Sequence, residues 1–207
     1  EYDSVKFTLP YPSGKLRLKK IIVDHKPNGS VESYLPNGKL LSTKPYVYGL
    51  ANGVGKNWDY NGNLSLEMPY TMDKVNGQMK GYRDGKLWYT NSYESDKSEG
   101  YYYDYHDNGA IASKVPFTND QRHGIAEYYA PDSSLMYRFT YFENVLKSFS
   151  YKNATGTFVR EKPVTLETSQ VICYYPNGKV SARISMKDGL YHGPFITYYP
   201  NGKIIQE

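Results

Sequence analysis

The sequence predicts an all-β fold: an elongated, twisted single antiparallel sheet, formed as a meander of stacked β-hairpin repeats. Three observations predict it. A short turn phrase returns at nearly constant spacing, apolar and polar residues alternate after each copy, and a second glycine turn follows each alternating stretch. Self-similarity at a fixed period is typical of repeat architectures, in which each repeat packs on its neighbours rather than around one globular centre.

The turn phrase defines the period. Tyr-Tyr-Pro-Asn-Gly-Lys occurs at residues 174–179 and again at 198–203. With its glycine as the marker of each repeat, the marker positions are Gly14, Gly38, Gly62, Gly85, Gly109, Ser133, Gly178 and Gly202. Successive markers are 24, 24, 23, 24, 24, 45 and 24 residues apart. The gap of 45 is close to two periods, with residue 156 or 157 at the missing marker, so about eight or nine repeats fill the chain.

Each repeat opens with a strand. Positions two, four, six and eight after the marker are mostly apolar, as in Leu135, Tyr137 and Phe139, and the residues between them are mostly polar. Strict alternation has the period of a β-strand with one buried face and does not fit a helix. We therefore expect strands, and no helices, between residues 60 and 140.

A second turn and a returning strand complete each repeat. Pairs such as Asn52-Gly53 and Asn76-Gly77 follow the alternating stretch. Asn-Gly and Asp-Gly favour tight hairpin turns, because both central residues accept positive φ at little cost. A returning strand, such as 194–199, then leads to the next marker. Strands joined by short turns pair with each other, which predicts one meander of about seventeen strands.

Composition predicts one repeat domain over residues 1–207, irregular at 142–170. No stretch changes composition enough to mark a linker. In the irregular stretch the marker degenerates, and Lys162-Pro163 interrupts the expected strand, so a bulge or loop is predicted there. Hydrophobic residues make up 39% and aromatic residues 16%, with 24 tyrosines, which is not the composition of a disordered chain.

Charge, cysteine content and hydropathy narrow the functional class. The net charge of +4 comes from 25 basic and 21 acidic residues mixed along the chain, too weak to predict nucleic-acid binding. Cys173 is the single cysteine and lies in an apolar run, which predicts a buried thiol. No run approaches the ~18 apolar residues of a membrane helix. Because the chain starts at Glu1 rather than Met, we expect an extracytoplasmic location, periplasmic or at the cell surface, with the cytoplasm as the alternative.

The sequence pattern offers no catalytic, metal or cofactor motif. It contains no Gly-x-Ser-x-Gly elbow, phosphate loop or dinucleotide fingerprint. The four histidines lack metal-ligand spacing, and His123 and His192 occupy one repeat position before a turn glycine. Asp84 and Asp188 precede glycines, where the turn explains them. We predict a protein that is not an enzyme, needs no cofactor and binds no metal.

The first candidates for partner or ligand binding are aromatic. Four residues before the marker stand Tyr34, Trp58, Tyr105, Tyr129, Tyr174 and Tyr198, and Tyr82 stands three before it. Equal positions in successive repeats lie in line, so we expect a ladder of rings on the inner, concave face, mostly as core. Exposed members are candidate contacts for sugar rings or for a partner's apolar segment. Trp58 and Trp88 come first, because indole is enriched in binding hot spots.

A line of lysines is the second candidate surface. Lysine follows the turn glycine at Lys15, Lys39, Lys86, Lys179 and Lys203. Stacked along one edge of the sheet, these side chains predict a rail for acidic head groups, glycans or an acidic protein. The alternative is a solvated turn position that also discourages pairing between sheet edges.

The turn phrase, the alternating strand after it, and the glycine pairs at 188–189 and 192–193 resemble the variant MORN repeat of bacterial proteins. The resemblance is strong over 171–207 and 28–64, moderate over 73–141 and weak over 142–170. It implies an elongated sheet of stacked hairpins and a role as an interaction module. Many bacterial members are labelled antitoxin-like, and eukaryotic relatives act as scaffolds or in membrane association.

The leading hypothesis is a non-enzymatic scaffold for protein–protein interaction. One alternative is a module that binds glycans or an anionic lipid surface. Another is an antitoxin or immunity protein that neutralises a partner. The expected partner is a protein, with a glycan or membrane surface as the alternative and no role for nucleic acid.

Overall fold

The computed structural model describes residues 4–206, and all regular secondary structure within that range is β-strand. The prediction of an all-β fold is confirmed. The chain divides into two compact units, Glu1–Ser98 and Glu99–Glu207, which we call unit 1 and unit 2. Strand β12 (Lys97–Tyr105) crosses the boundary. Both units are built from the same repeat, and the prediction of one repeat domain stays a prediction.

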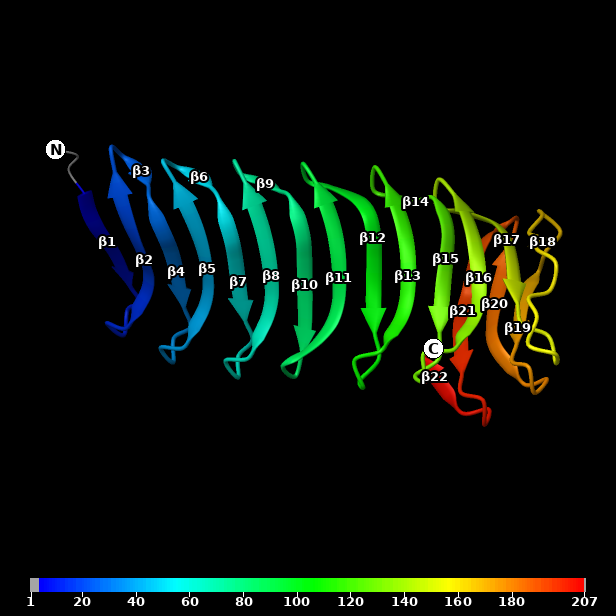
Figure 1. Cartoon of the computed structure of the whole chain (residues 1–207). Helices are drawn as coiled ribbons and strands as arrows, with labels where there is room; N and C mark the ends of the chain where they lie inside the picture. Colours follow the sequence, from blue (N-terminus) through cyan, green and yellow to red (C-terminus); the bar gives the residue numbers. More distant parts are fainter. Residues whose placement is uncertain (1–3, 207) are drawn as a thin grey trace. The chain divides into compact units, whose positions relative to one another are not determined.

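Unit 1 is an antiparallel sheet whose strands follow one another in chain order (Figure 1). Its long strands are β1 (Ser4–Pro10), β2 (Leu16–Val23), β4 (Gly29–Tyr34), β5 (Leu40–Val47), β7 (Gly53–Trp58), β8 (Leu64–Thr71), β10 (Gly77–Arg83) and β11 (Lys86–Glu94). Its two-residue strands are β3 (Lys26–Pro27), β6 (Leu50–Ala51) and β9 (Lys74–Val75). Each long strand pairs antiparallel with the next, which confirms the hairpin meander.

The tight turns lie a few residues before the predicted Asn-Gly pairs. In the β8–β9 hairpin the chain reverses at Met72 and Asp73, both with positive φ (49° and 69°). Gly77 instead opens the returning strand, with φ of 111°. A two-residue turn with positive φ suits aspartate and asparagine, so it forms before the glycine is reached. The glycine serves the re-entry into the sheet, where a Cβ would meet Pro69 Cγ at 3.3 Å.

The single 23-residue spacing has a structural explanation. Before Gly85 the marker turn is a two-residue turn, with φ of 51° at Asp84 and 75° at Gly85. The neighbouring marker turns are longer: the Gly38 N–H donates to Leu35 O at 2.8 Å, and the Leu35 N–H donates to Lys39 O at 2.8 Å. The shortened turn removes one residue and keeps Tyr82 at its place on the strand.

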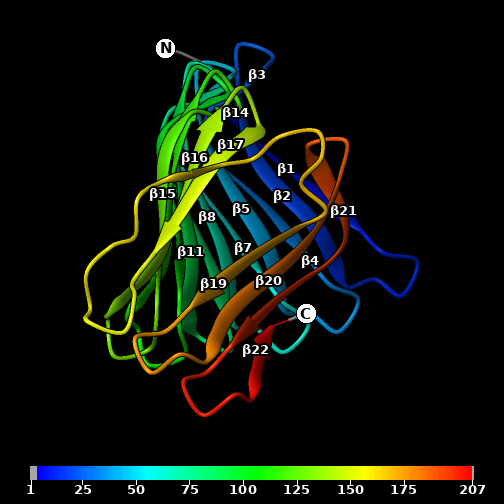
Figure 2. The ribbon, with the colours of Figure 1, turned by 90° about the vertical axis from the view of Figure 1, so that its right-hand side faces the viewer.

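Unit 2 contains two antiparallel sheets (Figures 1 and 2). The first holds its part of β12, then β13 (Ile111–Thr118), β14 (Gln121–Arg122), β15 (Gly124–Tyr129), β16 (Leu135–Phe142), β17 (Val145–Tyr151) and β18 (Lys162–Pro163). The second holds β19 (Gln170–Tyr174), β20 (Val180–Lys187), β21 (Leu190–Tyr198) and β22 (Ile204–Gln206). The structure thus adds a second sheet to the single predicted meander.

The predicted irregularity at 142–170 is where the chain leaves the first sheet. Between β17 and β19 the regular structure is reduced to the two residues of β18 and a bridge between Lys152 and Phe158. Pro163 is the last residue of β18, although prolines also lie inside the paired strands β5, β8 and β13. The next repeats then form hairpins of their own, β19–β20 and β21–β22.

The described hydrophobic core lies in unit 2, between its two sheets. Its buried members are Val115, Ala126, Ala130, Met136, Tyr137, Phe139, Tyr141, Leu146, Phe149, Val171, Cys173, Tyr175, Ala182, Ile184 and Met186. Phe139 in β16 and Ile184 in β20 are almost fully buried. The Tyr141 and Tyr191 hydroxyls hydrogen-bond at 2.5 Å and join the two sheets. Cys173 is buried as predicted, and burial raises the pKa of its thiol.

Side chains link successive repeats at both ends of the strands. At the marker turns, a side chain donates to a carbonyl of the next repeat: Tyr11 Oη to Tyr34 O at 2.7 Å in unit 1. In unit 2, Tyr175 Oη donates to Tyr198 O at 2.6 Å. At the opposite turns the next repeat supplies the acceptor, and the Ala51 N–H donates to Asp73 Oδ1 at 2.6 Å. These junctions are therefore held by side-chain bonds as well as by the backbone ladder.

Candidate functional site

In unit 1, the cross-strand register aligns polar residues in a row across one face of the sheet. Successive directly opposed residues are Thr8, Lys19, Glu32, Thr43, Lys56, Glu67, Lys80 and Thr90. We call these residues the charged row and the face on which they lie the charged face. Directly opposed residues of antiparallel strands point to the same face, which fixes the row without reference to any single contact.

The first carboxylate of the charged row is held by a cation and a phenol. Lys19 Nζ lies 2.9 Å from Glu32 Oε1, and Tyr34 donates a hydrogen bond to Glu32 Oε2. The hydrogen bond from Tyr34, followed by the one from Lys19, holds the pKa of Glu32 below its ordinary value. Both carboxylate oxygens of Glu32 are therefore already bonded within the chain.

The second carboxylate repeats this arrangement. Lys56 Nζ lies 3.0 Å from Glu67 Oε1, and Tyr82 Oη donates to Glu67 Oε2 at 2.8 Å. The Lys56 hydrogen bond, then the Tyr82 hydrogen bond, lowers the pKa of Glu67. Burial, reinforced by the bond to Glu67, raises the pKa of Tyr82 to about 12.

Unit 2 carries one copy of the same arrangement on the face away from its core. Glu127 and Arg138 are directly opposed, with Arg138 Nη2 3.0 Å from Glu127 Oε1. Tyr129 Oη donates to Glu127 Oε2 at 2.9 Å. Burial, followed by this hydrogen bond, raises the pKa of Tyr129 to about 12.

The predicted aromatic ladder lies on this charged face, and the expectation that it forms the inner core is wrong. Tyr34, Tyr82 and Tyr129 all bond to the glutamates described above. In unit 2 the core side of the sheet holds Tyr137 and Phe139 instead. Equal positions in successive repeats are two strands apart, about 9.6 Å, beyond the reach of ring–ring contact. The rings of the ladder therefore do not stack on one another.

The two tryptophans differ in exposure. Trp88 is 41% exposed, and the Arg83 guanidinium lies 3.7 Å from the centre of its ring. Trp88 also meets Tyr89 edge to face at 5.4 Å. Trp58 ends β7 and is half-buried. Trp58, two residues after Lys56 in β7, shares the charged face, whereas Trp88 lies at the register shift of β11 and packs beside Tyr89 on the opposite face.

The remaining ladder residues end strands of unit 2 and are half-buried. Tyr105 ends β12, and Tyr174 ends β19 with its ring 5.4 Å from that of Tyr151. Tyr198 ends β21, and its carbonyl accepts the hydrogen bond from Tyr175. Their part in binding stays a prediction.

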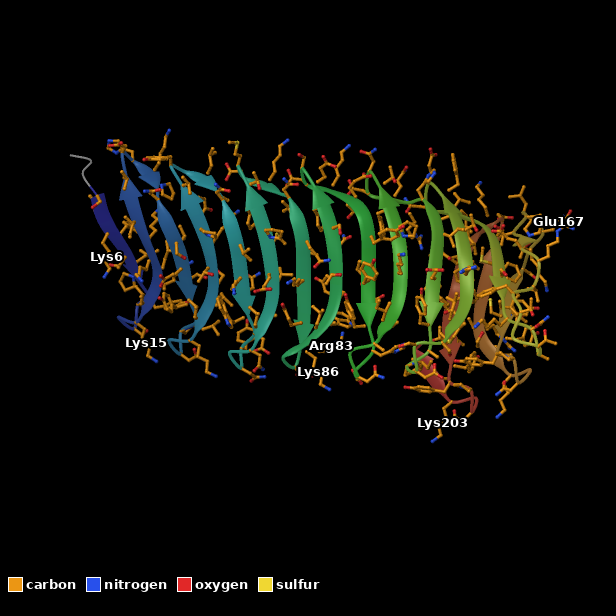
Figure 3. All side chains as sticks on the ribbon, viewed as in Figure 1. Lys6, Lys15, Arg83, Lys86, Glu167 and Lys203 are labelled. Atoms are coloured by element: carbon orange, nitrogen blue, oxygen red, sulfur yellow. The ribbon has the colours of Figure 1, made fainter. Side chains whose placement is uncertain are left out.

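The turn lysines are exposed, and two of them bind the next repeat. Lys39 Nζ donates to Asn61 O at 2.8 Å, and Lys179 Nζ donates to Asn201 O at 3.4 Å. Lys15, Lys86 and Lys203 lie at marker turns too (Figure 3). The bonds of Lys39 and Lys179 favour a structural role at this position, and a rail for acidic ligands stays a prediction.

Net charge is distributed unequally between the two units. Residues 1–98 hold 14 basic and 10 acidic residues, whereas residues 99–207 hold 11 of each. The basic side chains of the charged face in unit 1 are Lys6, Lys19, Lys56 and Lys80. The whole formal excess of +4 therefore belongs to unit 1.

Sequence reasoning missed the residues of the charged row. Lys19 and Arg138 stand five residues after the markers Gly14 and Ser133. Glu32 and Glu127 stand six residues before the markers Gly38 and Ser133. Opposite charges at these two positions were the available signal. This signal can be interpreted only when the pairing register is known, because the register decides which positions face each other.

The described residues show neither a metal centre nor a membrane-spanning helix. Residues 4–206 contain no group of three His, Cys, Asp or Glu side chains that could hold a metal ion. Within the same range no helix is long and apolar enough to cross a membrane. The chemistry that the charged face offers is ion pairing, hydrogen bonding and contact with aromatic rings.

Comparison with protein families gives one kind of match. The model described as MORN repeat variant matches residues 27–48, 98–119, 169–188 and 191–207. The first segment contains the β4–β5 hairpin of unit 1, and the last two contain the second sheet of unit 2. No match was found among curated proteins. One repeat type thus builds sheets in both units.

Proposed function

Because this chain belongs to the family of MORN repeat variants, we propose that it acts as a non-enzymatic scaffold that holds a protein partner. MORN repeats are generally modules for interaction with proteins or lipids and are generally not enzymes. Within that range, the distribution of core and surface between the units favours a protein partner bound by unit 1.

The observation that carries the proposal is that unit 1 is a single layer. Its strands belong to one sheet, whereas the core cluster of the described residues lies entirely in unit 2. A sheet without a covering layer in its own unit leaves side chains of both faces half-exposed. On the charged face these include Trp58, Tyr34 and Tyr82, and tryptophan and tyrosine are enriched in protein interfaces.

The charged face suits a protein better than a lipid surface. Its row contains both signs of charge, with each glutamate fixed by a lysine and a tyrosine. A patterned surface of this kind discriminates between partners by complementarity. An anionic membrane needs mainly exposed cations, and of the turn lysines that would supply them, Lys39 and Lys179 bond to the neighbouring turn.

Cross-linking of the full chain in an extract of its source cells tests the proposal. With a lysine-reactive cross-linker, we expect peptides of a protein partner to be joined to Lys6 or Lys80 in unit 1. Lys147 and Lys187, exposed in unit 2, serve as the internal comparison. Cross-links confined to unit 2 would overturn the assignment to unit 1. Binding to a glycan array or to phosphatidylserine vesicles without any protein cross-link would overturn the scaffold itself.

A further inference from the structure

We propose that the face of unit 1 opposite the charged face, which we call the reverse face, binds an amphipathic α-helix that carries two carboxylates. The helix belongs to a protein partner and lies across the strands. This inference goes beyond the proposed scaffold function, because it assigns a binding surface to the other side of the sheet. The register, the charge balance and the spacing of two lysines support it.

The register also aligns a row of residues on the reverse face. Each member precedes or follows a member of the charged row by one residue, and neighbouring residues of a strand point to opposite faces. The row contains Phe7, Lys20, Val31, Lys44, Gly55, Met68, Met79 and Asn91. Apart from the two lysines and the asparagine, its members are glycine or apolar.

Both lysines of this row lie against aromatic rings. Lys20 Nζ lies 4.9 Å from the centre of the Phe7 ring, and Lys44 Nζ lies 4.1 Å from that of Tyr70. Neither lysine belongs to an ion pair within residues 4–206. A ring attracts a cation but leaves its charge uncompensated, and an ammonium has three N–H donors. Each lysine can therefore bind a carboxylate from outside the chain.

The reverse face has no carboxylate of its own within residues 4–98. Glu32 and Glu67 belong to the charged row. Glu94 lies on the charged face too, because it follows the row member of β11 by an even number of residues. The aspartates of this range lie between strands, at Asp24, Asp59, Asp73, Asp84 and Asp96. The two lysines are thus left without an acidic counterpart on their own face.

The spacing of the two lysines predicts a helix. Lys20 in β2 and Lys44 in β5 have β4 between them, so they are two strand intervals, about 9.6 Å, apart. Side chains on one face of an extended strand are about 6.8 or 13.6 Å apart, because only every second residue shares a face. Residues i and i+7 of an α-helix share a face and are about 10.5 Å apart. A single segment that reaches both lysines is therefore a helix.

The rest of the row suits the apolar residues of such a helix. Val31 lies between the two lysines and is half-buried, so it would meet residue i+3 or i+4. Beyond the second lysine the row continues with Gly55, Met68 and Met79. From the first lysine to Met79 the row crosses five strand intervals, about 24 Å, which is the length of about 16 helical residues.

The equivalent face of unit 2 is covered by the second sheet of that unit. Val115 and Phe139 stand six residues after their markers, at the repeat position of the two lysines, and both are buried in the core. A carboxylate brought to this position would be buried without a cation, which is unfavourable. The helix is therefore expected on unit 1 and not on unit 2.

Binding of two fluorescein-labelled helical peptides of about 18 residues to the full chain tests the inference. One peptide has a leucine stripe that includes two glutamates seven residues apart, and the other has lysines in their place. We expect the unaltered chain to bind the glutamate peptide about tenfold or more tightly than the lysine peptide. Lys20→Glu/Lys44→Glu should reverse this preference, because the lysine peptide then meets opposite charges.

Lys6→Glu/Lys80→Glu is the matched control, since it makes the same change in net charge on the charged face of the same unit. This control should keep the preference for the glutamate peptide. The milder pair Lys20→Met/Lys44→Met should remove the preference without adding a repulsive charge. Urea unfolding of each variant separates lost binding from lost folding.

Several results would overturn the inference. Equal binding of both peptides by the unaltered chain would show that the lysines do not select a carboxylate. Loss of the preference in the control pair would mean that net charge rather than the reverse face attracts the peptide. Phosphatidylserine vesicles that bind through Lys20 and Lys44 while the glutamate peptide does not would assign the face to a lipid. If neither peptide binds and cross-links to Lys6 or Lys80 still form, this inference falls and the scaffold stands.

Discussion

The two units place the same repeat positions on the same face of a sheet and use that face differently. Six residues after the marker, unit 1 has Lys44 and Met68, whereas unit 2 has Val115 and Phe139. Lys44 Nζ lies 4.1 Å from the centre of the Tyr70 ring, whereas Phe139 is fully buried between two sheets. The backbone pattern of the repeat makes a sheet in either case. The residue at this position decides whether a second layer can cover it.

Energetics explain the difference. Burying a large apolar side chain contributes about 1.5–3 kcal/mol, and burying an unpaired lysine costs more than that. An apolar second layer such as β20, with Ala182, Ile184 and Met186 in the core, is compatible with Phe139 but not with Lys44. The face of unit 1 that holds Lys44, opposite the charged face, therefore cannot be covered by an apolar second sheet in the way that unit 2 is.

The strongest test of this contrast compares Phe139→Ala with Met68→Ala, at one repeat position. Phe139 packs on the rings of Tyr128, Tyr137 and Phe195, at 5.1, 4.9 and 6.3 Å. Its removal is expected to lower the free energy of unfolding by about 3–5 kcal/mol. Half-buried Met68 is expected to cost about 1 kcal/mol. Urea unfolding followed by circular dichroism measures both, and equal losses would remove the distinction between the units.

A smaller effect is expected where unit 1 packs a ring directly on backbone. An added Cβ at Gly81 would lie 2.0 Å from Tyr89 Cε1, whereas at Gly55 the nearest atom, Tyr70 Cε2, is 3.0 Å away. Gly81→Ala is therefore expected to cost about 1–3 kcal/mol, and Gly55→Ala less. Unit 2 already has alanine, Ala126, at the repeat position of Gly55. A neutral Gly81→Ala in urea unfolding would show that the ring is free to move aside.

The acid limb of the stability curve tests the charged row. The folded-state pKa of Glu67 lies below its ordinary value of 4.5, so its carboxylate stabilises the fold above that pH. This stability is lost as pH falls through the lower, folded-state pKa. In Glu67→Gln, the free energy of unfolding should fall by about 0.2–1 kcal/mol less than in the unaltered chain between neutral and acid pH, as measured by urea unfolding. Exposed Glu167, changed to Gln, is the control, and an equal change there would contradict a special role for Glu67.

The smallest expected effect on the free energy of unfolding concerns the turn lysines. Lys39→Met removes the bond to Asn61 O and should lower the free energy of unfolding by about 0.5 kcal/mol. Lys15→Met, at the same repeat position, should cost less. Urea unfolding measures both changes. An equal loss in Lys15→Met would show that the bond to Asn61 O contributes nothing specific at this position.

The period, the hairpins and the irregular stretch could be predicted because they depend on local residue order. The marker glycines indicate turns and alternation indicates strands, although the Asn-Gly pairs such as Asn76-Gly77 lie after the second turn rather than in it. The second sheet could not be predicted, since the alternation at 180–186 is the same as that in repeats of the first sheet. Which sheet a hairpin joins depends on the loop at 152–169, whose path the local pattern does not determine.

The face of the aromatic ladder could not be predicted for a related reason. Tyr128 and Tyr129 are neighbours of one type, and a shift in register falls between them. Tyr128 packs on the core rings, whereas Tyr129 bonds to Glu127 on the other face. Composition treats the two tyrosines alike, and only the pairing of β15 with β16 distinguishes them.

The side-chain bonds between repeats give the stack a direction. At one end of the strands a repeat donates to its successor, as Tyr11 does to Tyr34 O, and at the other end it receives an acceptor from it, as Ala51 does from Asp73. The junction chemistry is therefore preserved when a whole repeat is duplicated or removed, but not when a repeat is cut elsewhere or reversed. A protein built in this way can change the length of its sheet in steps of about 9.6 Å, one hairpin at a time.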